Sequence, residues 1–584
     1  MLRPTTNPFR QSITTPDFWD FRFDPDDEGK DKGWAEGFEG GRPIAVPASW
    51  NDQFESERDN LGPAWYQTQF DLPWGWLEKD VRLRFGSVNY LAEVWLNGTR
   101  LGQHEGGHLP FEFDVTPHLR LEDNLLVVRV DGQLAPDRVP PGKIPDSELD
   151  TFGRLNYPDT SFDFFPFCGI HRPVHLSATP HGGLEDLTVT TTIEGERGLV
   201  HVRIERMGEA QVTARVSLRG HGVELTEEAA LTESGDVAIE VEDPALWSPD
   251  SPALYDLSVQ LVDGDGTFDR YDLPVGIRTI EVDGDDLLLN GEPVRLTGFG
   301  RHEDFPVTGR GFVPAVVVKD YALMKWIGAN SFRTSHYPYS ERMMDLADRL
   351  GFLVIDETPA VGLFFHEQGL EKRHALCRQY IEELIARDKN HPSVIMWSVA
   401  NEPHSKRPPA RPFFHDLTDL VRSLDPTRPV TLVSTLGVRE EALEFCDVVC
   451  MNRYHGWYSY PAQLDKGVEA LSQELDAIHD RFPKPLLLSE FGADTIPGWH
   501  AQPSEMFSEE YQTEMLTRYI QVAREKPYVI GEHVWNLCDF KTAQAVHRMG
   551  AMNFKGVFTR DRRPKMAAHK LRELWTEKVE EETE

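Results

Sequence analysis

The segment SVIMWSVANEP, residues 393–403, runs from a strongly apolar stretch directly into a carboxylate. Its first part has the composition of a strand buried on both faces, and Asn401, Glu402 and Pro403 follow at its end. A structural turn at a strand end needs no acid. A (β/α)8 barrel, in contrast, presents its catalytic groups directly after buried parallel strands. The remaining sequence decides between these two interpretations.

Seven further segments after residue 277 share this apolar, strand-like character. The eight candidate strands are VRLTGFGRHE (294–303), ANSFRTSH (329–336), FLVIDETP (352–359), SVIMWSVANEP (393–403), PVTLVST (429–435), DVVCMNRYH (447–455), PLLLSEFG (485–492) and VIGEHVWN (529–536). Helical stretches such as ERMMDLADRLG (341–351) separate them. Eight strand-then-helix units are the number that a closed barrel needs. Residues 277–584 are therefore predicted to form a (β/α)8 TIM barrel.

The chain before this barrel is predicted to be all β. Residues 1–180 contain short alternating strands, with Asn97-Gly98 as a tight hairpin signal, which is typical of a jelly-roll β-sandwich of the sugar-binding type. Residues 181–276 contain a second series of short strands, whose spacing fits a small immunoglobulin-like β-sandwich. The predicted fold class is thus multidomain, with two β-sandwiches followed by an α/β barrel.

Composition excludes several classes of function. The 584 residues include 60 basic and 96 acidic side chains, a net charge of -36, which argues against binding nucleic acid or an anionic membrane. No apolar run is long enough to span a bilayer, and the first residues lack a secretory signal. The five cysteines are scattered, with no disulfide framework and no metal-ligand spacing. We expect a cytoplasmic protein with no metal and no cofactor.

Two acids stand at the ends of candidate strands on different sides of the predicted barrel. Glu402 ends the fourth strand and Glu490 ends the seventh. Hydrolysis of a glycosidic bond needs such a pair, one acid to protonate the leaving oxygen and one carboxylate opposite it. At a separation of about 5–5.5 Å the second carboxylate attacks the sugar directly and configuration is retained. The pair therefore indicates a glycoside hydrolase.

The sequence resembles glycoside hydrolase family 2, and within it the β-glucuronidases. The motifs that carry the resemblance span nearly the whole chain: VPASWNDQF (46–54), GIHRPV (169–174), TGFGRHED (297–304), RTSHYPYS (333–340), ARDKNHPSVIMWSVANEP (386–403), NRYHGWY (452–458), SEFGADT (489–495) and NFKGVFTRDRRPK (553–565). The family's fold is a jelly roll, an immunoglobulin-like sandwich and a (β/α)8 barrel. That fold agrees with the prediction from strand patterns.

The resemblance implies roles for particular residues. Glu402 matches the general acid/base and Glu490 the nucleophile. Asn401 is expected to bond the sugar 2-hydroxyl, and Tyr454 to position the nucleophile carboxylate. Further expected substrate contacts are Asp163 from the first domain, His336, Asn452 and Trp535. Each of these residues also has an ordinary structural interpretation, as a cap, a core side chain or an interface contact.

The substrate class is indicated by Asn553-Phe554-Lys555, just beyond the eighth strand. Glucuronic acid carries a C6 carboxylate, which suits an ammonium and an amide donor, and a hydrogen bond to a charged group is worth about 1.5–3 kcal/mol. The family's β-glucuronidases have an Asn-x-Lys pair at this place, and Arg548 matches another residue near that carboxylate. The expected partner is therefore a small-molecule or oligosaccharide β-glucuronide.

Two departures from the family pattern modify this expectation. The segment LFFHEQGLEKR (363–373) is shorter than the insertion that some family members carry over the site, which predicts a more open mouth. His455 replaces the family's usual tyrosine, so that one contact at the rim is expected to differ. The acidic end, VEEETE (579–584), is predicted to be disordered.

Alternatives remain open at this stage. Asn553 and Lys555 argue against neutral sugars, as in β-galactosidases and β-mannosidases, but would tolerate a β-galacturonide. A non-catalytic sugar-binding protein on the same scaffold is a second alternative, against which stands the presence of both Glu402 and Glu490. The resemblance further implies a homo-oligomer, a tetramer or a dimer.

Overall fold

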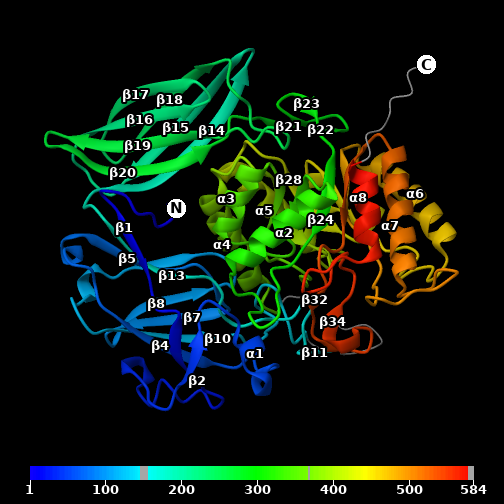
Figure 1. The fold of residues 1–584 in the computed structure, drawn as a ribbon, viewed down its shortest axis with the longest axis horizontal. Helices are drawn as coiled ribbons and strands as arrows, with labels where there is room; N and C mark the ends of the chain where they lie inside the picture. Colours follow the sequence, from blue (N-terminus) through cyan, green and yellow to red (C-terminus); the bar gives the residue numbers. More distant parts are fainter. Residues whose placement is uncertain (145–155, 366–367, 577–584) are drawn as a thin grey trace.

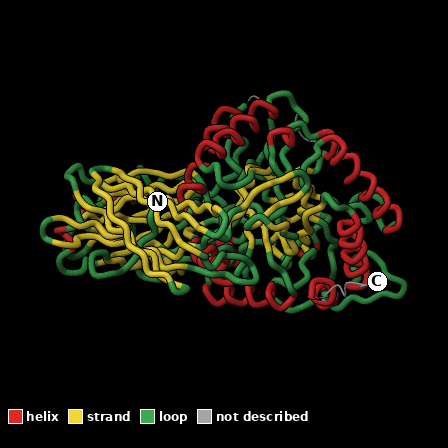
Figure 2. The backbone as a smooth tube through the Cα atoms, turned by 90° about the horizontal axis from the view of Figure 1, so that it is seen from above, coloured by secondary structure: helices red, strands yellow, loops and turns green. Residues whose placement is uncertain are grey.

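The computed structural model describes residues 1–144, 156–365 and 368–576, so that the acidic end of the chain lies outside the described residues. Two β-sandwiches lie beside one large α/β domain (Figure 1). Seen from above, strands fill one half of the molecule, and helices surround a central group of strands in the other half (Figure 2). The predicted fold class is confirmed.

The first sandwich consists mainly of two antiparallel sheets. One has the order β1-β13-β5-β9, with bounds Gln11–Thr14, Val174–Thr179, Asp80–Phe85 and Phe111–Asp114. The other has the order β3-β2-β4-β10-β7-β8, with bounds Arg42–Ala45, Phe18–Phe23, Ala64–Phe70, Asn124–Asp131, Leu91–Leu96 and Thr99–Glu105. Asn97 and Gly98 join β7 to β8 with φ of 52° and 80°, the positive values that a two-residue hairpin turn requires.

The second sandwich pairs a three-stranded sheet with a four-stranded one. The orders are β14-β15-β18 (Leu184–Glu194, Arg197–Arg206, Ser234–Glu242) and β17-β16-β19-β20 (Val223–Leu231, Val212–Gly220, Tyr255–Asp263, Gly266–Val275). Along β15 the buried side chains alternate, with Val200, Val202 and Ile204 facing the core. This period of two is the pattern of a half-buried strand.

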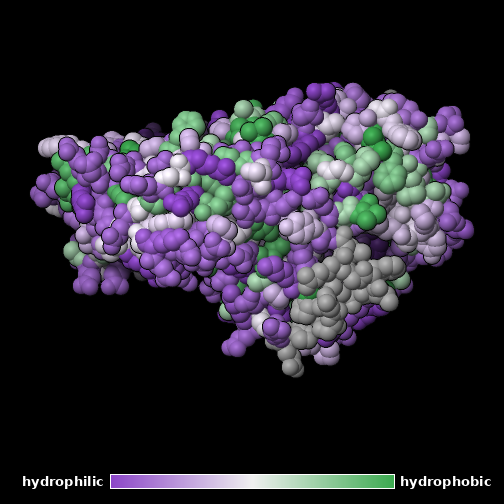
Figure 3. All heavy atoms as spheres, turned by 90° about the horizontal axis from the view of Figure 1, so that it is seen from below, coloured by the Kyte–Doolittle hydropathy of each residue, from purple (hydrophilic) through white to green (hydrophobic). Residues whose placement is uncertain are grey.

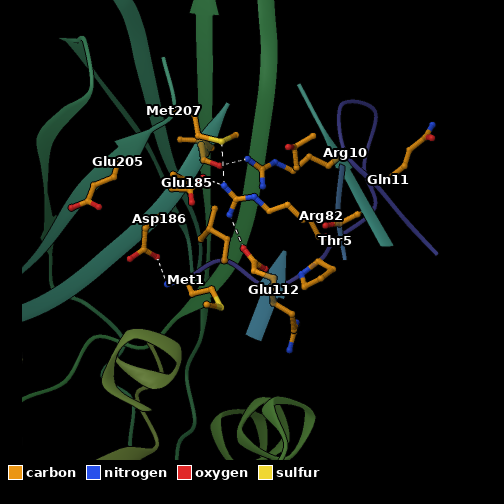
Figure 4. Close-up of a pocket in the computed structure, with 16 residues that line it drawn as sticks. Met1, Thr5, Arg10, Gln11, Arg82, Glu112, Glu185, Asp186, Glu205 and Met207 are labelled. Atoms are coloured by element: carbon orange, nitrogen blue, oxygen red, sulfur yellow. Dashed lines mark hydrogen bonds and ion pairs between the residues drawn. The ribbon is translucent and has the colours of Figure 1, made fainter. Parts of the chain in front are cut away.

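A cavity of about 280 Å³ lies where the two sandwiches meet (Figure 4). Arg82 of β5 points across it, donating to Glu185 of β14 at 2.8 Å and to Glu112 of β9 at 2.6 Å. On the same wall Arg10 forms a buried ion pair with Asp269 at 2.6 Å. Arg82 and Arg10 therefore each have a carboxylate partner within the protein. We interpret this cavity as part of the interface between the two sandwiches.

Eight parallel strands form a closed barrel in chain order. They are β24 (Leu296–Gly300), β25 (Ser331–Arg333), β26 (Leu353–Glu357), β27 (Val394–Asn401), β28 (Val430–Ser434), β29 (Val449–Asn452), β30 (Leu486–Glu490) and β31 (Val529–Val534). The connecting and following helices are α2 (Pro314–Ile327), α3 (Glu341–Leu350), α4 (Leu370–Asp388), α5 (Ala410–Leu424), α6 (Leu464–Arg481), α7 (Glu509–Glu525) and α8 (Met566–Thr576). All eight predicted strands are present.

The two ends of the barrel differ in character. A small sheet, β21-β22-β23 (Ile280–Asp283, Asp286–Leu289, Glu292–Pro293), shares one buried apolar cluster with the first residues of several barrel strands. This apolar cluster closes the amino end. At the carboxyl end, five strands terminate in buried residues with a charged or amide side chain: Arg333, Glu357, Asn401, Asn452 and Glu490. Since the strands are parallel, these five side chains gather at one end.

The surface agrees with the acidic composition. The face seen in Figure 3 is mostly hydrophilic, with apolar side chains in separate patches. None of the helices among the described residues is both long enough and apolar enough to cross a bilayer.

Candidate active site

A cavity of about 730 Å³ opens at the carboxyl end of the barrel. Ten of the eleven predicted site residues line it: Asp163, His336, Asn401, Glu402, Tyr454, Glu490, Trp535, Arg548, Asn553 and Lys555. The eleventh, Asn452, lies behind the wall and contacts Glu402. Residues from far apart in the sequence thus meet in one cavity of the size that ligand sites typically have.

Glu490, at the end of β30, is held by two donors. Arg333 donates to its Oε1, and the Tyr454 hydroxyl donates to its Oε2 at 2.7 Å. Arg333 is completely buried and also donates to both oxygens of Glu357, at 2.7 and 2.9 Å. One guanidinium therefore fixes two carboxylates that end different barrel strands, β26 and β30. A carboxylate with such donors is stabilised in its charged form.

Glu402 has a different environment. Its Oε1 accepts a hydrogen bond of 2.7 Å from the Asn452 amide, which also donates to Asn401 at 3.2 Å. The Ser489 hydroxyl donates to Asn452 at 2.9 Å and so fixes the amide's orientation. The backbone of Glu402 has φ 45°, a left-handed conformation that is costly for a residue with a side chain. The loop after β27 therefore stores strain to place this carboxyl.

Burial changes the protonation of both acids. It raises the pKa of Glu490 to about 8, with Arg333 acting in the opposite direction and the nearby charge of Glu402 adding to the increase. Burial also raises the pKa of Glu402, which the Asn452 hydrogen bond partly offsets. Two coupled carboxyls of this kind share one proton near neutral pH. We place it on Glu402, because Glu490 has the guanidinium and the phenol to stabilise its charge.

Lys555 lies in the cavity wall, where its ammonium group already has partners from the protein. Its Nζ donates to Asp494 and, at 2.9 Å, to the Tyr458 hydroxyl, and the side chain is almost completely buried. Burial acts to raise the pKa of Asp494, but Lys555 and Arg548 outweigh it and hold that pKa below its ordinary value. The ammonium and this carboxylate therefore form a charged pair inside the wall.

Arg548 and Asn553 both donate to Asp163. Arg548 Nε is 2.8 Å from Asp163 Oδ1, and Asn553 Nδ2 is 2.9 Å from Asp163 Oδ2. Arg548 also contacts Asp494 at 3.1 Å. The Asp163 side chain is 44% exposed, whereas that of Arg548 is 5% exposed. Asp163 therefore accepts hydrogen bonds from Arg548 and Asn553, the same donors that the sequence analysis assigned to the C6 carboxylate of the substrate.

Asp163 reaches the barrel because its segment pairs with the barrel's last loop. β11 (Asn156–Tyr157) forms a two-stranded sheet with β33 (Gln544–Ala545), and Phe165 donates from its backbone to Lys541 at 2.8 Å. This contact joins residues almost 400 positions apart in the chain. The first domain thereby completes the cavity.

Aromatic rings form another part of the wall. His336 stacks on Trp535 with ring centroids 4.9 Å apart, and its Nδ1 lies 3.1 Å from Glu357. Of the aromatic residues near the strand ends, Trp457 is buried against Phe507, outside the cavity, and Trp499 lies on the surface. Only part of the aromatic content near the strand ends is thus available to a ligand.

The two departures from the family pattern have different outcomes. His455 does not line the cavity; its ring bonds Ser459 at 2.6 Å and Glu474 at 2.9 Å. The expected change at the rim is therefore a change in a supporting contact. The short segment 363–373 includes His366 and Glu367, which lie outside the described residues, so that the predicted open mouth stays a prediction.

Four residues of the site were not assigned from the sequence: Arg333, Glu357, Tyr458 and Asp494. Arg333 and Glu357 end predicted strands, so that the rule applied to Glu402 and Glu490 would have found them. Tyr458 and Asp494 stand in loops, inside the motifs NRYHGWY (452–458) and SEFGADT (489–495) that carry the family resemblance, and these motifs are the signal that could have found them. Among the described residues, no group of three or more metal-ligating side chains is present.

Three regions of the chain match models of one known protein family. Residues 280–579 match the family described as "Glycosyl hydrolases family 2, TIM barrel domain". Residues 15–180 match that family's sugar binding domain, and residues 183–278 match a third region, described by the family name alone.

Similar proteins cover nearly the whole chain. A β-glucuronidase of Paenibacillus borealis is 42% identical, over 99% of each chain. A solved β-glucuronidase structure from an uncultured Clostridium sp. is 40% identical with a TM-score of 0.92, over 98% of this chain and 99% of that one. A Ruminococcus gnavus β-glucuronidase, solved in complex with D-glucuronic acid, is 37% identical with a TM-score of 0.91 over the same shares.

Proposed function

The chain belongs to glycosyl hydrolase family 2, and on that premise we propose that it is a retaining, exo-acting β-glucuronidase for terminal β-D-glucuronides. The observation that carries the proposal is the cavity itself, which has two buried carboxyls beside Arg548, Asn553 and Lys555. The acids supply the hydrolysis, and the donors supply a site for a C6 carboxylate.

The sugar is oriented by the wall opposite the acids. Its C6 carboxylate takes the place of Asp163 on Arg548 and Asn553, and approaches the Lys555 ammonium. Asp163, the exposed partner, then turns to the sugar hydroxyls. Asn401 lies at the end of β27 beside Glu402, where it bonds the 2-hydroxyl, a contact that strengthens in an oxocarbenium-like transition state.

Hydrolysis proceeds in two displacements. The Glu490 carboxylate attacks C1 while Glu402 gives its proton to the glycosidic oxygen, so that the aglycone leaves as an alcohol and a glycosyl ester forms. Glu402, now ionised, takes a proton from water, which attacks C1 and releases glucuronic acid with retained configuration. Tyr454 and Arg333 hold Glu490 in position for both steps.

The test of this function compares three chromogenic substrates on one preparation. We expect rapid hydrolysis of the β-glucuronide, much slower hydrolysis of the β-galacturonide, which differs at the C4 hydroxyl, and little of the neutral β-galactoside. A preference for the galactoside would assign another specificity within the family. Binding of glucuronic acid without hydrolysis of any of the three would favour the sugar-binding alternative.

The pH profile of kcat/KM follows from the shared proton. The active form carries one proton on the two acids, so that we expect a bell-shaped profile. Its alkaline limb should lie above the range of an exposed carboxyl, because burial raises the pKa of both acids in the folded enzyme and the last proton is lost there. Measured rates from pH 4 to 10 check this, and a rate that stays constant across that range contradicts the scheme.

The cellular setting completes the proposal. The five cysteines are all buried and unpaired, which supports a reducing compartment such as the cytoplasm. The resemblance to family 2 supports a homo-oligomer, tetramer or dimer. The mechanism assigns no step to a metal or cofactor.

A further inference from the structure

The cavity continues past Glu402 on the side where the leaving group must lie. Phe364, His404 and Lys406 line this part, together with Val361 and Gly362. Ligand cavities for drug-sized molecules measure about 300–1,000 Å³, so that about 730 Å³ leaves room beyond one sugar ring. The residues to which the proposed function gives a role all surround the sugar, and these residues are not among them.

Phe364 and His404 form a stacked aromatic pair in this part of the cavity, and the outer ring face of this pair is called the Phe364–His404 surface. Their rings are stacked, with centroids 4.2 Å apart and planes 16° from parallel. The backbone N–H of His404 donates to Leu363 at 2.8 Å, which joins the two loops that carry the rings. A flat aromatic surface beside a reacting sugar suits the face of another ring.

The loop that carries His404 and Lys406 is anchored between them. The hydroxyl of Ser405 donates to Glu440, which is completely buried. Glu440 also accepts from the Ser434 hydroxyl at 3.0 Å and from the backbone of Ala442 at 3.1 Å. Ser405 is therefore fixed inward, and the side chains on either side of it are exposed on the cavity.

Lys406 is the cation that this cavity leaves uncompensated. Arg548 and Lys555 are paired with Asp163 and Asp494. Within the described part of the chain, no carboxylate lies within ion-pair distance of Lys406, and its ammonium has no hydrogen-bond acceptor. An exposed ammonium without a carboxylate partner attracts an anionic group.

We propose that the enzyme prefers glucuronides whose aglycone is a ring bearing an anionic group. The ring lies on the Phe364–His404 surface and its carboxylate or sulfate pairs with Lys406, while Glu402 protonates the oxygen between the two units. This inference rests on the proposed function and names its substrate class. Two sources share this chemistry, an aromatic acid and an acidic sugar of an oligosaccharide.

The experiment uses matched pairs of substrates that differ by one anionic group. The aryl pair is 4-nitrophenyl β-D-glucuronide and its 3-carboxy derivative. The sugar pair is a glucuronyl disaccharide whose second sugar is neutral and the same disaccharide with a sulfate on that sugar. The variants are Lys406→Met, Lys406→Arg as a conservative rescue, and Lys319→Met as a control on the exposed face of α2.

We expect Lys406→Met to lower kcat/KM for the anionic member of a pair by about twofold to fivefold, the range of an accessible ion pair. The neutral member should change little, Lys406→Arg should restore the preference, and Lys319→Met should leave it intact. Added salt should weaken the preference of the wild type, because accessible charges are screened. The pair that shows the larger selective loss identifies the source of the aglycone.

Other outcomes overturn the inference. If Lys406→Met leaves the ratio of kcat/KM between the anionic and the neutral substrate unchanged in both pairs, the proposed aglycone class is wrong. The proposed β-glucuronidase activity is not affected by that result. Equal losses on both members of each pair assign Lys406 a role in the loop's structure, and also overturn it. A wild type that cleaves no glucuronide overturns the proposed function first, and the inference with it.

Discussion

Replacing Glu490 by Gln is expected to abolish turnover, with a loss of about 10⁴-fold or more. No glycosyl ester can form without the carboxylate, and the amide places its own donors against Arg333. Glu532→Gln is a matched control, since Glu532 is an equally buried carboxyl, paired with Arg295 at 2.6 Å and outside the cavity. Initial rates with thermal unfolding of both variants separate lost chemistry from lost stability.

Glu402→Gln should give a loss that depends on the leaving group. An activated nitrophenolate departs without protonation, whereas an alkyl alcohol loses the roughly 10²–10⁴-fold contribution of general acid catalysis. The same variant should remove the alkaline limb of the pH profile, because no acid remains to be deprotonated. Equal losses on both kinds of leaving group would assign the proton donor to another residue.

Lys555→Ala is expected to reduce kcat/KM on a β-glucuronide by about a hundredfold or more, since the loss of a buried charged partner costs a few kcal/mol and each tenfold is about 1.4 kcal/mol. The structure adds a second cause: Asp494 would keep only its ion pair with Arg548 at 3.1 Å, and its less compensated charge would repel the C6 carboxylate. A β-glucoside, which is neutral at C6, should keep its slow turnover. Measuring kcat/KM for the β-glucuronide and the β-glucoside on the same preparation checks this, and the ratio of the two values should fall in the variant.

A double variant isolates the recognition of the carboxylate from the stability of the wall. Lys555→Met with Asp494→Asn removes the ion pair as a unit and leaves no unpaired charge at this position. We expect it to be more stable than Lys555→Ala and still poor on the glucuronide. Recovery of glucuronide activity in the double variant would show that the single loss came from the uncompensated charge of the buried Asp494.

The sequence alone was sufficient to predict the barrel and the position of the two acids at the carboxyl ends of its strands. Strand-like segments alternate with helical ones eight times, and this periodicity is a local property of the chain. Strand limits were predicted less closely, as with 447–455 against the observed Val449–Asn452, since backbone pairing between strands, which composition does not show, sets where a strand ends. Glu402 and Glu490 were found because each directly follows a buried strand.

Only the tertiary structure decided how the charges of the site are paired. Arg333 joins Glu357 to Glu490 because the barrel closes with their strand ends together, and Arg548 meets Asp163 because a sheet between two domains brings them into contact. Neither pairing follows from sequence spacing. Local patterns determine which element a residue belongs to, whereas the partner of a buried charge depends on contacts between distant segments, which form only when the whole chain has packed.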